Sequence, residues 1–153
     1  IGEFDKDGFL KITDRKKQLF KTSGGKYIAP QVIENKMKIS PFIEQIMVIG
    51  EGEKMPSALI QPDFEYVRNW LLKNKSTFSD DLKNICTNKD LLLKIELEIN
   101  KINEEFGDWE RIKKFEITPE IWTIENGLLT PTMKLKRKAI IQKFIHLKEK
   151  IYN

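Results

Sequence analysis

Two short segments carry residue types suited to work on an anionic ligand. In Ser23-Gly24-Gly25-Lys26, the glycines allow φ > 0 and a close approach of the backbone to a bound molecule, and the lysine places a cation at the bend. The second segment contains Lys134, which follows Pro131-Thr132-Met133 and precedes a predicted helix. A lysine on a restricted loop before an anchoring helix can hold an ammonium group in a fixed place.

Each segment also has a purely structural interpretation. The glycine segment lacks the four-residue spacer and the second glycine before Lys-Ser/Thr that define a phosphate-binding P-loop, so by itself it is typical of a plain turn. Lys134 stands close to Lys136, Arg137 and Lys138, a run that on its own is typical of a solvated helix start. From the local pattern alone, both structural interpretations stay open.

Other reactive side chains are few. Cys86 is the only cysteine, which excludes an intrachain disulfide and fits a reducing compartment; we expect it to pack under a short helix. His146, the only histidine, lies among lysines and is expected to be solvated. The sequence has no His/Cys cluster for a structural metal. Trp70 and Trp122 are expected in the core or at a domain contact.

Length and composition fit one domain with a real core. The chain has 153 residues, of which 40% are hydrophobic and 33% charged. Its net charge of +4 permits anionic ligands such as phosphates but is too small to indicate nucleic-acid binding by itself. No apolar run reaches transmembrane length, and no signal-peptide pattern opens the chain. Because the chain lacks an initiator methionine and starts inside a predicted strand, we expect a fragment.

The elements that must position the glycine segment lie in the first part of the chain. The pattern predicts a hairpin of strands 2–4 and 9–13, a charged connector at 14–17 and a short strand at 18–22. A helix is predicted from Pro30, with Ile33 and Met37 on one face, ending before Pro41.

The middle of the chain alternates strands and helices. Strands are predicted at 45–49 and 57–61, and the near-continuous apolar run of the first favours a central strand. Asp63 is expected to cap the next helix and Ser79 to cap another that carries Leu82 and Ile85. The clearest helix starts near Asn88, with Gly107 where a C-terminal cap would lie.

The elements around Lys134 come last. A strand is predicted at 114–118, a turn at 125–127, and a closing helix whose apolar stripe contains Ile140, Phe144, Leu147 and Ile151. Strands mixed with helices, without regular alternation, indicate an α+β fold. We expect a small domain with a mainly antiparallel sheet flanked by helices, preceded by a short β-hairpin and a hinge.

Two matches in the right order give the sequence a family resemblance. Asp14-Arg15, with a charged residue at Lys17, resembles the hinge between the two domains of the adenylate-forming enzymes. The segment from Leu129 to Lys138 resembles the loop that carries their catalytic lysine, in the Leu-Thr-Pro-Thr-x-Lys form of the AMP-forming long-chain fatty-acid–CoA ligases. Met133 stands where many members of the wider superfamily have glycine.

The resemblance extends over the whole chain and implies a division of roles. Residues 1–17 would end the large N-terminal domain and form the hinge, with Asp14 and with Lys17 as its pivot, and residues 18–153 would be the mobile C-terminal domain. Lys134 would be the catalytic cation of acyl-adenylate formation, and Arg15 would reach the nucleotide. The loop Ser23-Gly24-Gly25-Lys26 would line the coenzyme A tunnel during thioester formation.

The resemblance further implies ATP, coenzyme A and Mg²⁺ as cofactors of the full-length enzyme, with the Mg²⁺ site outside this chain. Its partners would be its own N-terminal adenylation domain and the substrates fatty acid, ATP and coenzyme A, without nucleic acid. We expect a cytoplasmic ligase that associates peripherally with membranes, and a fragment that is inactive alone. The alternative is a basic, non-catalytic module whose last helix binds nucleic acid or an anionic membrane surface, although no aromatics are interleaved with its basic residues.

Overall fold

The computed structural model describes residues 19–153. The predicted first hairpin and the hinge residues Asp14, Arg15 and Lys17 lie outside the described residues, so the predictions made for them stay predictions. The described elements, in chain order, are β1 (Phe20–Lys21), β2 (Tyr27–Ile28), α2 (Pro30–Met37), β3 (Ile43–Ile49), β4 (Ser57–Pro62), α3 (Phe64–Lys73), α4 (Leu82–Cys86), α5 (Lys89–Asn103), the 3₁₀ turn η1 (Asp108–Glu110), β5 (Phe115–Ile117), α6 (Arg137–Lys143) and α7 (Ile145–Tyr152).

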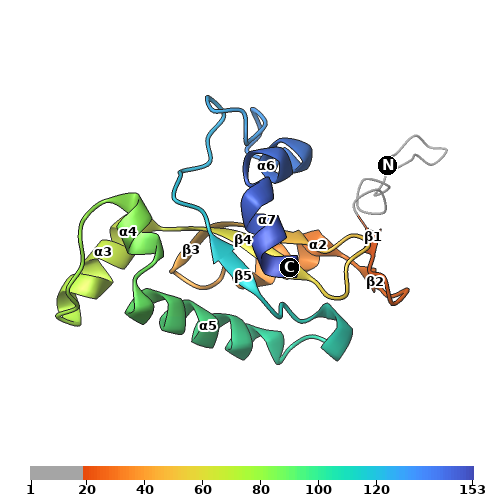
Figure 1. Cartoon of the computed structure of the whole chain (residues 1–153), viewed down its shortest axis with the longest axis horizontal. Coiled ribbons are helices and arrows are strands. Elements are labelled where there is room, and N and C mark those ends of the chain that lie inside the picture. The colour runs from red at the N-terminus through yellow and green to blue at the C-terminus, as the bar shows by residue number, and fades with distance from the viewer. Residues whose placement is uncertain (1–18) are drawn as a thin grey trace, which may run out of the picture.

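A three-stranded sheet in the order β3-β4-β5 forms the centre of the domain. β3 pairs with β4 antiparallel, and β5 pairs with β4 parallel. β1 and β2 form a separate antiparallel pair. Figure 1 shows α5 on one side of the sheet and α6 and α7 on the other. The predicted α+β fold is confirmed, and its main sheet contains one antiparallel and one parallel pair.

Each face of the sheet has its own hydrophobic core. Because successive side chains of a strand point to opposite faces, Ile46 and Val48 join the core that includes α2, α3 and α5. Met47 and Ile49 join the core formed with α6, α7 and the preceding loop. The prediction that residues 45–49 form the central strand is wrong, since β4 is central. Residues 46–49 of β3 are apolar because both faces of the strand are buried, and not because the strand lies in the middle of the sheet.

Local signals in the sequence fix several helix starts. Pro30 occupies the first turn of α2, where its missing N–H costs nothing. As predicted, the carboxylate of Asp63 accepts the N–H of Tyr66 at 3.1 Å and starts α3. The Asn88 side chain likewise accepts the N–H of Leu91 at 3.0 Å and starts α5. These residues act within one turn of the chain, so the sequence pattern identifies them.

Two predicted caps are wrong. Ser79 does not cap α4, because Asp81 lies directly before the helix and accepts the N–H of Lys83 at 3.0 Å. Gly107 does not end α5, which stops at Asn103. The buried Asn103 side chain exchanges two 3.0 Å hydrogen bonds with the backbone of Ile112, and this pairing turns the chain away before the glycine.

The predicted closing helix consists of two helices. α6 ends and α7 begins around Phe144, whose φ of −111° and ψ of 30° are not helical. Its ring stacks on Trp122 with centroids 6.3 Å apart, which holds this residue inward at the break. Phe144, Ile140 and Ile151 are buried as predicted, so the stripe is correct although the helix is interrupted.

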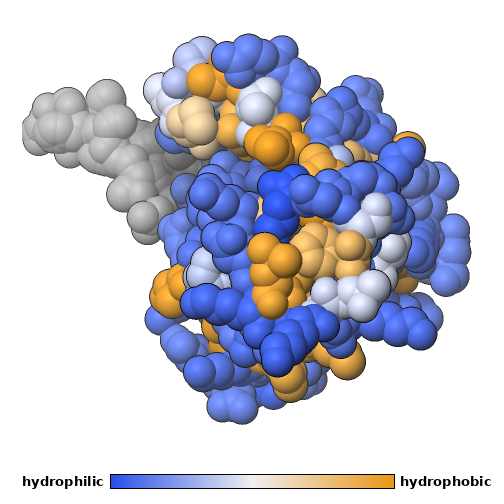
Figure 2. All heavy atoms as spheres, turned by 90° about the vertical axis from the view of Figure 1, so that its left-hand side faces the viewer, coloured by the Kyte–Doolittle hydropathy of each residue, from blue (hydrophilic) through white to orange (hydrophobic). Residues whose placement is uncertain are grey.

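Figure 2 shows the end of the molecule that carries α3 and α4: hydrophobic residues form separate patches within a mainly hydrophilic surface. Among residues 19–153, no helix combines the length and the apolar character needed to cross a bilayer.

Candidate functional site

A tight loop presents Lys134. Leu129 and Leu135 form an isolated antiparallel bridge at the base of the loop. One residue further into the loop, the N–H of Thr130 donates to the carbonyl of Lys134 at 2.8 Å. In return, the Thr130 hydroxyl accepts the N–H of Lys134 at 3.0 Å. The lysine backbone is therefore fixed twice by one residue, while its side chain is exposed to solvent.

Met133 has the left-handed backbone conformation, with φ of +67°. This conformation costs an ordinary residue roughly 1–2 kcal/mol and costs glycine almost nothing. The loop is closed around it by a 2.7 Å hydrogen bond from the Met133 N–H to the Thr130 carbonyl. The turn before Lys134 therefore has a shape that favours glycine, although this chain has methionine there.

A partly buried ion pair anchors the helix that follows. Arg137, at the start of α6, donates to both carboxylate oxygens of Glu34 on α2, each at 2.8 Å. The Glu34 side chain is only 6% exposed and also accepts the N–H of Val48 at 2.8 Å. The sequence alone does not predict this pair. A glutamate within the helical face of Ile33 and Met37 signals that a partner is needed, but nothing local identifies Arg137.

A small polar cavity of about 140 Å³ lies beside the lysine loop. Lys134 and Arg137 line one side of it, and polar residues of α2, of its C-cap and of β3 line the other, namely Gln31, Asn35, Lys38 and Gln45. The exposed ammonium group of Lys134 thus adjoins a concave polar surface rather than a flat one.

The glycine segment is the turn between β1 and β2. Thr22 closes it in both directions, since its N–H donates to the Lys26 carbonyl at 3.0 Å and its carbonyl accepts the Gly25 N–H at 2.9 Å. Gly25 has φ of +85°, and a Cβ at Gly24 or Gly25 would meet nothing within 4 Å. The bare backbone of this turn therefore faces open space.

Neighbouring segments hold the turn in place. The Ser23 N–H donates to the Glu53 carbonyl at 2.8 Å, and the Gly52 N–H donates to the Lys21 carbonyl at 3.0 Å. The turn is therefore fastened to the connection between β3 and β4. The Lys26 ammonium lies 5.5 Å from the centre of the exposed Trp109 ring on η1, within the range of a cation–π interaction.

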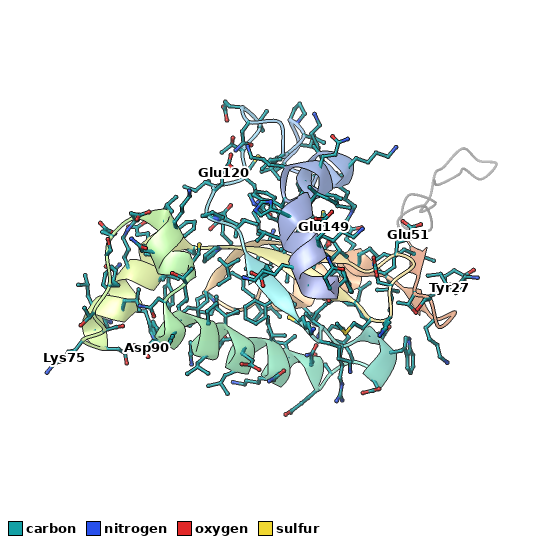
Figure 3. The ribbon with its side chains drawn as sticks, in the orientation of Figure 1. Tyr27, Glu51, Lys75, Asp90, Glu120 and Glu149 are labelled. Atoms are coloured by element: carbon teal, nitrogen blue, oxygen red, sulfur yellow. The ribbon has the colours of Figure 1, made fainter. Side chains whose placement is uncertain are left out.

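The two segments lie in different parts of the domain. In Figure 1, the chain between β5 and α6 runs on the α6 side of the sheet, whereas the β1–β2 hairpin lies at the right-hand end. Figure 3 shows Tyr27 and Glu51 at that end and Glu120 near α6. The cavity beside Lys134 contains no residue of the glycine turn among its lining residues. The catalytic role of Lys134 and the coenzyme A contacts of the turn stay predictions.

The remaining candidates have the surroundings expected of them. Trp122 is buried, Trp70 is half-buried and packs with Phe42, and His146 is exposed on α7. Within the part of the chain that the structure describes, no group of three or more His, Cys, Asp or Glu residues could hold a metal ion.

Cys86 is buried in α4, with its Sγ 3.7 Å from the Thr118 carbonyl. Burial raises the pKa of this thiol from 9.0 to about 12, and the charge of Asp81 adds to the effect. Because only the thiolate reacts, an aromatic disulfide reagent at about pH 8 should modify the folded protein about 10³ times more slowly than the urea-unfolded protein. The absorbance of the released thiolate measures both rates, and equal rates would contradict the buried position.

Comparison with known proteins places these features in a family. The model of the AMP-binding enzyme C-terminal domain matches residues 17–153. The long-chain-fatty-acid–CoA ligase FadD15 of Mycobacterium tuberculosis is 39% identical over 153 residues, which is all of this chain and 26% of the relative. The human long-chain-fatty-acid–CoA ligase 1 is 38% identical over 143 residues, which is 92% of this chain and 20% of the relative.

Solved structures show the same fold. The adenylation domain of a carboxylate reductase from Mycobacterium chelonae matches with a TM-score of 0.73 and 22% identity, over 97% of this chain and 24% of that one. The chain thus spans about a quarter of the length of the proteins it matches. From the family match over nearly its whole length, we conclude that the chain belongs to the family of AMP-binding enzyme C-terminal domains.

Proposed function

We propose that this chain is the mobile C-terminal domain of an ATP-dependent, AMP-forming long-chain fatty-acid–CoA ligase. The observation that carries the proposal is similarity across the whole chain to a long-chain ligase, at 39% identity. Within the proposal, residues 1–17 end the adenylation domain and provide the hinge, and residues 18–153 move as the C-terminal domain.

Lys134 serves the first half-reaction in this proposal. The fatty-acid carboxylate attacks the α-phosphate of ATP, the bond to the β-phosphate breaks, and pyrophosphate leaves. Negative charge grows on the phosphate oxygens, and a fixed ammonium group stabilises it most where water is excluded. Two hydrogen bonds between Thr130 and Lys134 hold the lysine backbone in place. The ion pair of Arg137 with Glu34 anchors the helix that follows. Both contacts support this role.

The glycine turn serves the second half-reaction. The coenzyme A thiolate attacks the acyl carbonyl, and the bond to the phosphate breaks so that AMP leaves. The open backbone at Gly24 and Gly25 supports a role in lining the narrow pantetheine path, with Ser23 and Lys26 at its sides. A rotation at the hinge of Asp14 and Lys17 exchanges the two segments, and binding of the second substrate selects the second orientation.

ATP, coenzyme A and Mg²⁺ act in the full-length enzyme, and Arg15 contacts the nucleotide. Within residues 19–153, no group of three or more His, Cys, Asp or Glu residues could hold a metal ion. The proposal assigns the metal to the adenylation domain, which together with fatty acid, ATP and coenzyme A makes up the partners of this chain. The full-length ligase is proposed to be cytoplasmic and to associate peripherally with membranes.

The direct test is activity of the full-length protein. With ATP, Mg²⁺, palmitate and coenzyme A as substrates, we expect the full-length protein to form palmitoyl-CoA, AMP and pyrophosphate in equal amounts. Chromatography of the reaction mixture measures the three products. The present 153-residue chain should form none of them. Absence of AMP from the full-length reaction would refute the proposal. Salt-dependent binding of nucleic acid or anionic vesicles, with a slope of several phosphate contacts, would instead favour a basic, non-catalytic module.

The hinge assignment predicts the effect of Lys17→Pro in the full-length protein. Proline fixes φ near −65° and should block the rotation, so thioester formation slows while acyl-adenylate formation is largely kept. Single-turnover assays of each half-reaction measure the two rates. Lys17→Ala is the matched control, because it removes the same side chain and leaves the backbone free. Normal rates of both steps in the proline variant would show that the hinge lies elsewhere.

A further inference from the structure

The polar cavity beside the lysine loop is lined by a buried amide. Gln45 of β3 lines this cavity and is only 9% exposed. Its cross-strand neighbour on β4, Gln61, uses both ends of its own amide, since the nitrogen donates to the Pro62 carbonyl at 3.0 Å and the oxygen accepts the Trp122 N–H at 2.9 Å. Within residues 19–153, the Gln45 amide has no such hydrogen-bond partner. Because buried polar groups are normally paired, this amide is available to a molecule in the cavity.

The charges around the cavity are unequal. Its lining contains one carboxylate, that of Glu34, and three cations, namely Lys38, Lys134 and Arg137. Glu34 is 6% exposed, and both of its oxygens accept hydrogen bonds from Arg137 at 2.8 Å. Lys38 and Lys134 are exposed, and neither takes part in an ion pair within residues 19–153. With its carboxylate already paired and two cations left over, the cavity favours an anionic ligand.

Size and donor groups narrow the class of anion. The volume of about 140 Å³ is well below the roughly 300 Å³ at which pockets for drug-sized molecules begin. A phosphate group therefore fits, whereas a nucleoside or an acyl chain does not. Besides Gln45, the amides of Gln31 and Asn35 line the α2 side and offer further N–H donors. Amide and ammonium groups both donate to phosphate oxygens, and the bonds from ammonium are the stronger because both partners are charged.

We propose that this cavity binds a phosphate-type oxyanion, held by the buried amide of Gln45 and by the exposed ammonium group of Lys38. The source of the oxyanion rests on the proposed function, in which Lys134 stabilises the α-phosphate of ATP. Since Lys134 also lines the cavity, the oxyanion next to it is either another phosphate of the same nucleotide or the pyrophosphate after its release. Gln45 and Lys38 thereby become binding residues of the first half-reaction.

The first experiment measures binding of pyrophosphate to the 153-residue chain, which needs no turnover. We expect a saturable change in the NMR signal of the Gln45 side-chain amide. Calorimetry gives the dissociation constant, which Lys38→Glu should raise at least about tenfold. Lys73→Glu is the matched control, because Lys73 is exposed at the end of α3 and its replacement changes the net charge equally. An unchanged Gln45 signal, or equal effects of the two lysine variants, would overturn the proposal.

A second variant tests the buried amide. Gln45→Leu removes the N–H donors and keeps a side chain of similar size, so pyrophosphate should bind about tenfold more weakly, the loss expected for one hydrogen bond to a charged group. Unchanged affinity in this variant would show that the anion lies elsewhere. If the buried substitution prevents folding, the surface variant Lys38→Glu and its control still decide the matter.

Kinetics of the full-length protein separate the two sources. In the reverse of the first half-reaction, a pyrophosphate oxygen bonds to the phosphorus of the acyl-adenylate, the bond from that phosphorus to the acyl carboxylate breaks, and ATP and free fatty acid form. Lys38→Glu should raise the KM for pyrophosphate about tenfold in this direction. It should also raise the KM for ATP in the forward direction if the phosphates of the nucleotide occupy the cavity, and leave it unchanged if only released pyrophosphate does.

An unchanged KM for both substrates would overturn the proposal. Palmitoyl-CoA formation by the parent protein tests the proposed ligase function separately. Pyrophosphate binding at Gln45 without palmitoyl-CoA formation would keep the anion site and refute the ligase, whereas palmitoyl-CoA formation without such binding would refute the anion site alone.

Discussion

Replacing Lys134 by alanine in the full-length protein should slow acyl-adenylate formation by about 10²–10³, because one preorganised charge opposite developing negative charge has an effect of this size. Thioester formation from supplied acyl-adenylate should be largely kept, since the proposed function assigns that step to the glycine turn. Pyrophosphate release under single-turnover conditions measures the first rate, and acyl-CoA formation from synthetic acyl-adenylate measures the second.

Lys138→Ala is the matched control for this experiment. Lys138 is also exposed and lies four residues further on, in the first turn of α6. Its removal lowers the net charge by the same amount but takes no cation from the loop, so both half-reactions should keep their rates. An equal loss of both steps in the Lys134 variant would contradict the role assigned to this lysine, as would an equal effect of the two variants.

Replacing Glu34 by alanine should lower the free energy of unfolding by about 3 kcal/mol, the lower end of the cost of removing one partner from a buried ion pair, because Arg137 is 26% exposed and keeps some contact with water. The change leaves the Arg137 guanidinium without its two 2.8 Å hydrogen bonds and the Val48 N–H without its acceptor. Urea unfolding of the 153-residue chain, followed by tryptophan fluorescence, gives the difference between variant and parent.

A second glutamate provides the control. Glu105 also pairs with a basic residue, Lys36 of α2, at 2.8 Å, but both side chains are about half exposed. Glu105→Ala should therefore change the free energy of unfolding by less than about 1 kcal/mol. Similar losses in the two variants would mean that burial does not distinguish the pairs. Glu34→Gln should fall between them, since the amide oxygen still accepts the Val48 N–H while the charge is lost.

The parts of the fold that the sequence predicts correctly depend on neighbours along the chain. Asp63 and Asn88 cap helices through residues three positions away, and Pro30 starts a helix through its own ring. The errors arise where distant contacts decide. Asn103 ends α5 by pairing with Ile112, and Phe144 at the α6–α7 break stacks on Trp122. Such contacts leave no periodic signal.

The candidate site divides in the same way. The residue types around Lys134 and in the glycine turn are visible in the sequence, and a family resemblance assigns them roles. The positive φ of Met133, which gives the lysine loop its shape, appears only in the structure. The pairing of Glu34 with Arg137 is equally hidden, because it joins residues 103 positions apart.

That pairing has a consequence for inhibition. Glu34 lies on α2, which directly follows the β1–β2 hairpin, and Arg137 lies three residues after Lys134, so their bidentate contact ties the glycine turn and the lysine loop to one block. In the proposed function, these two segments of the block enter the same active centre in turn. Two compounds that touch entirely different residues, one trapping the lysine orientation and the other trapping the glycine orientation, should therefore compete with each other as if they shared a single site.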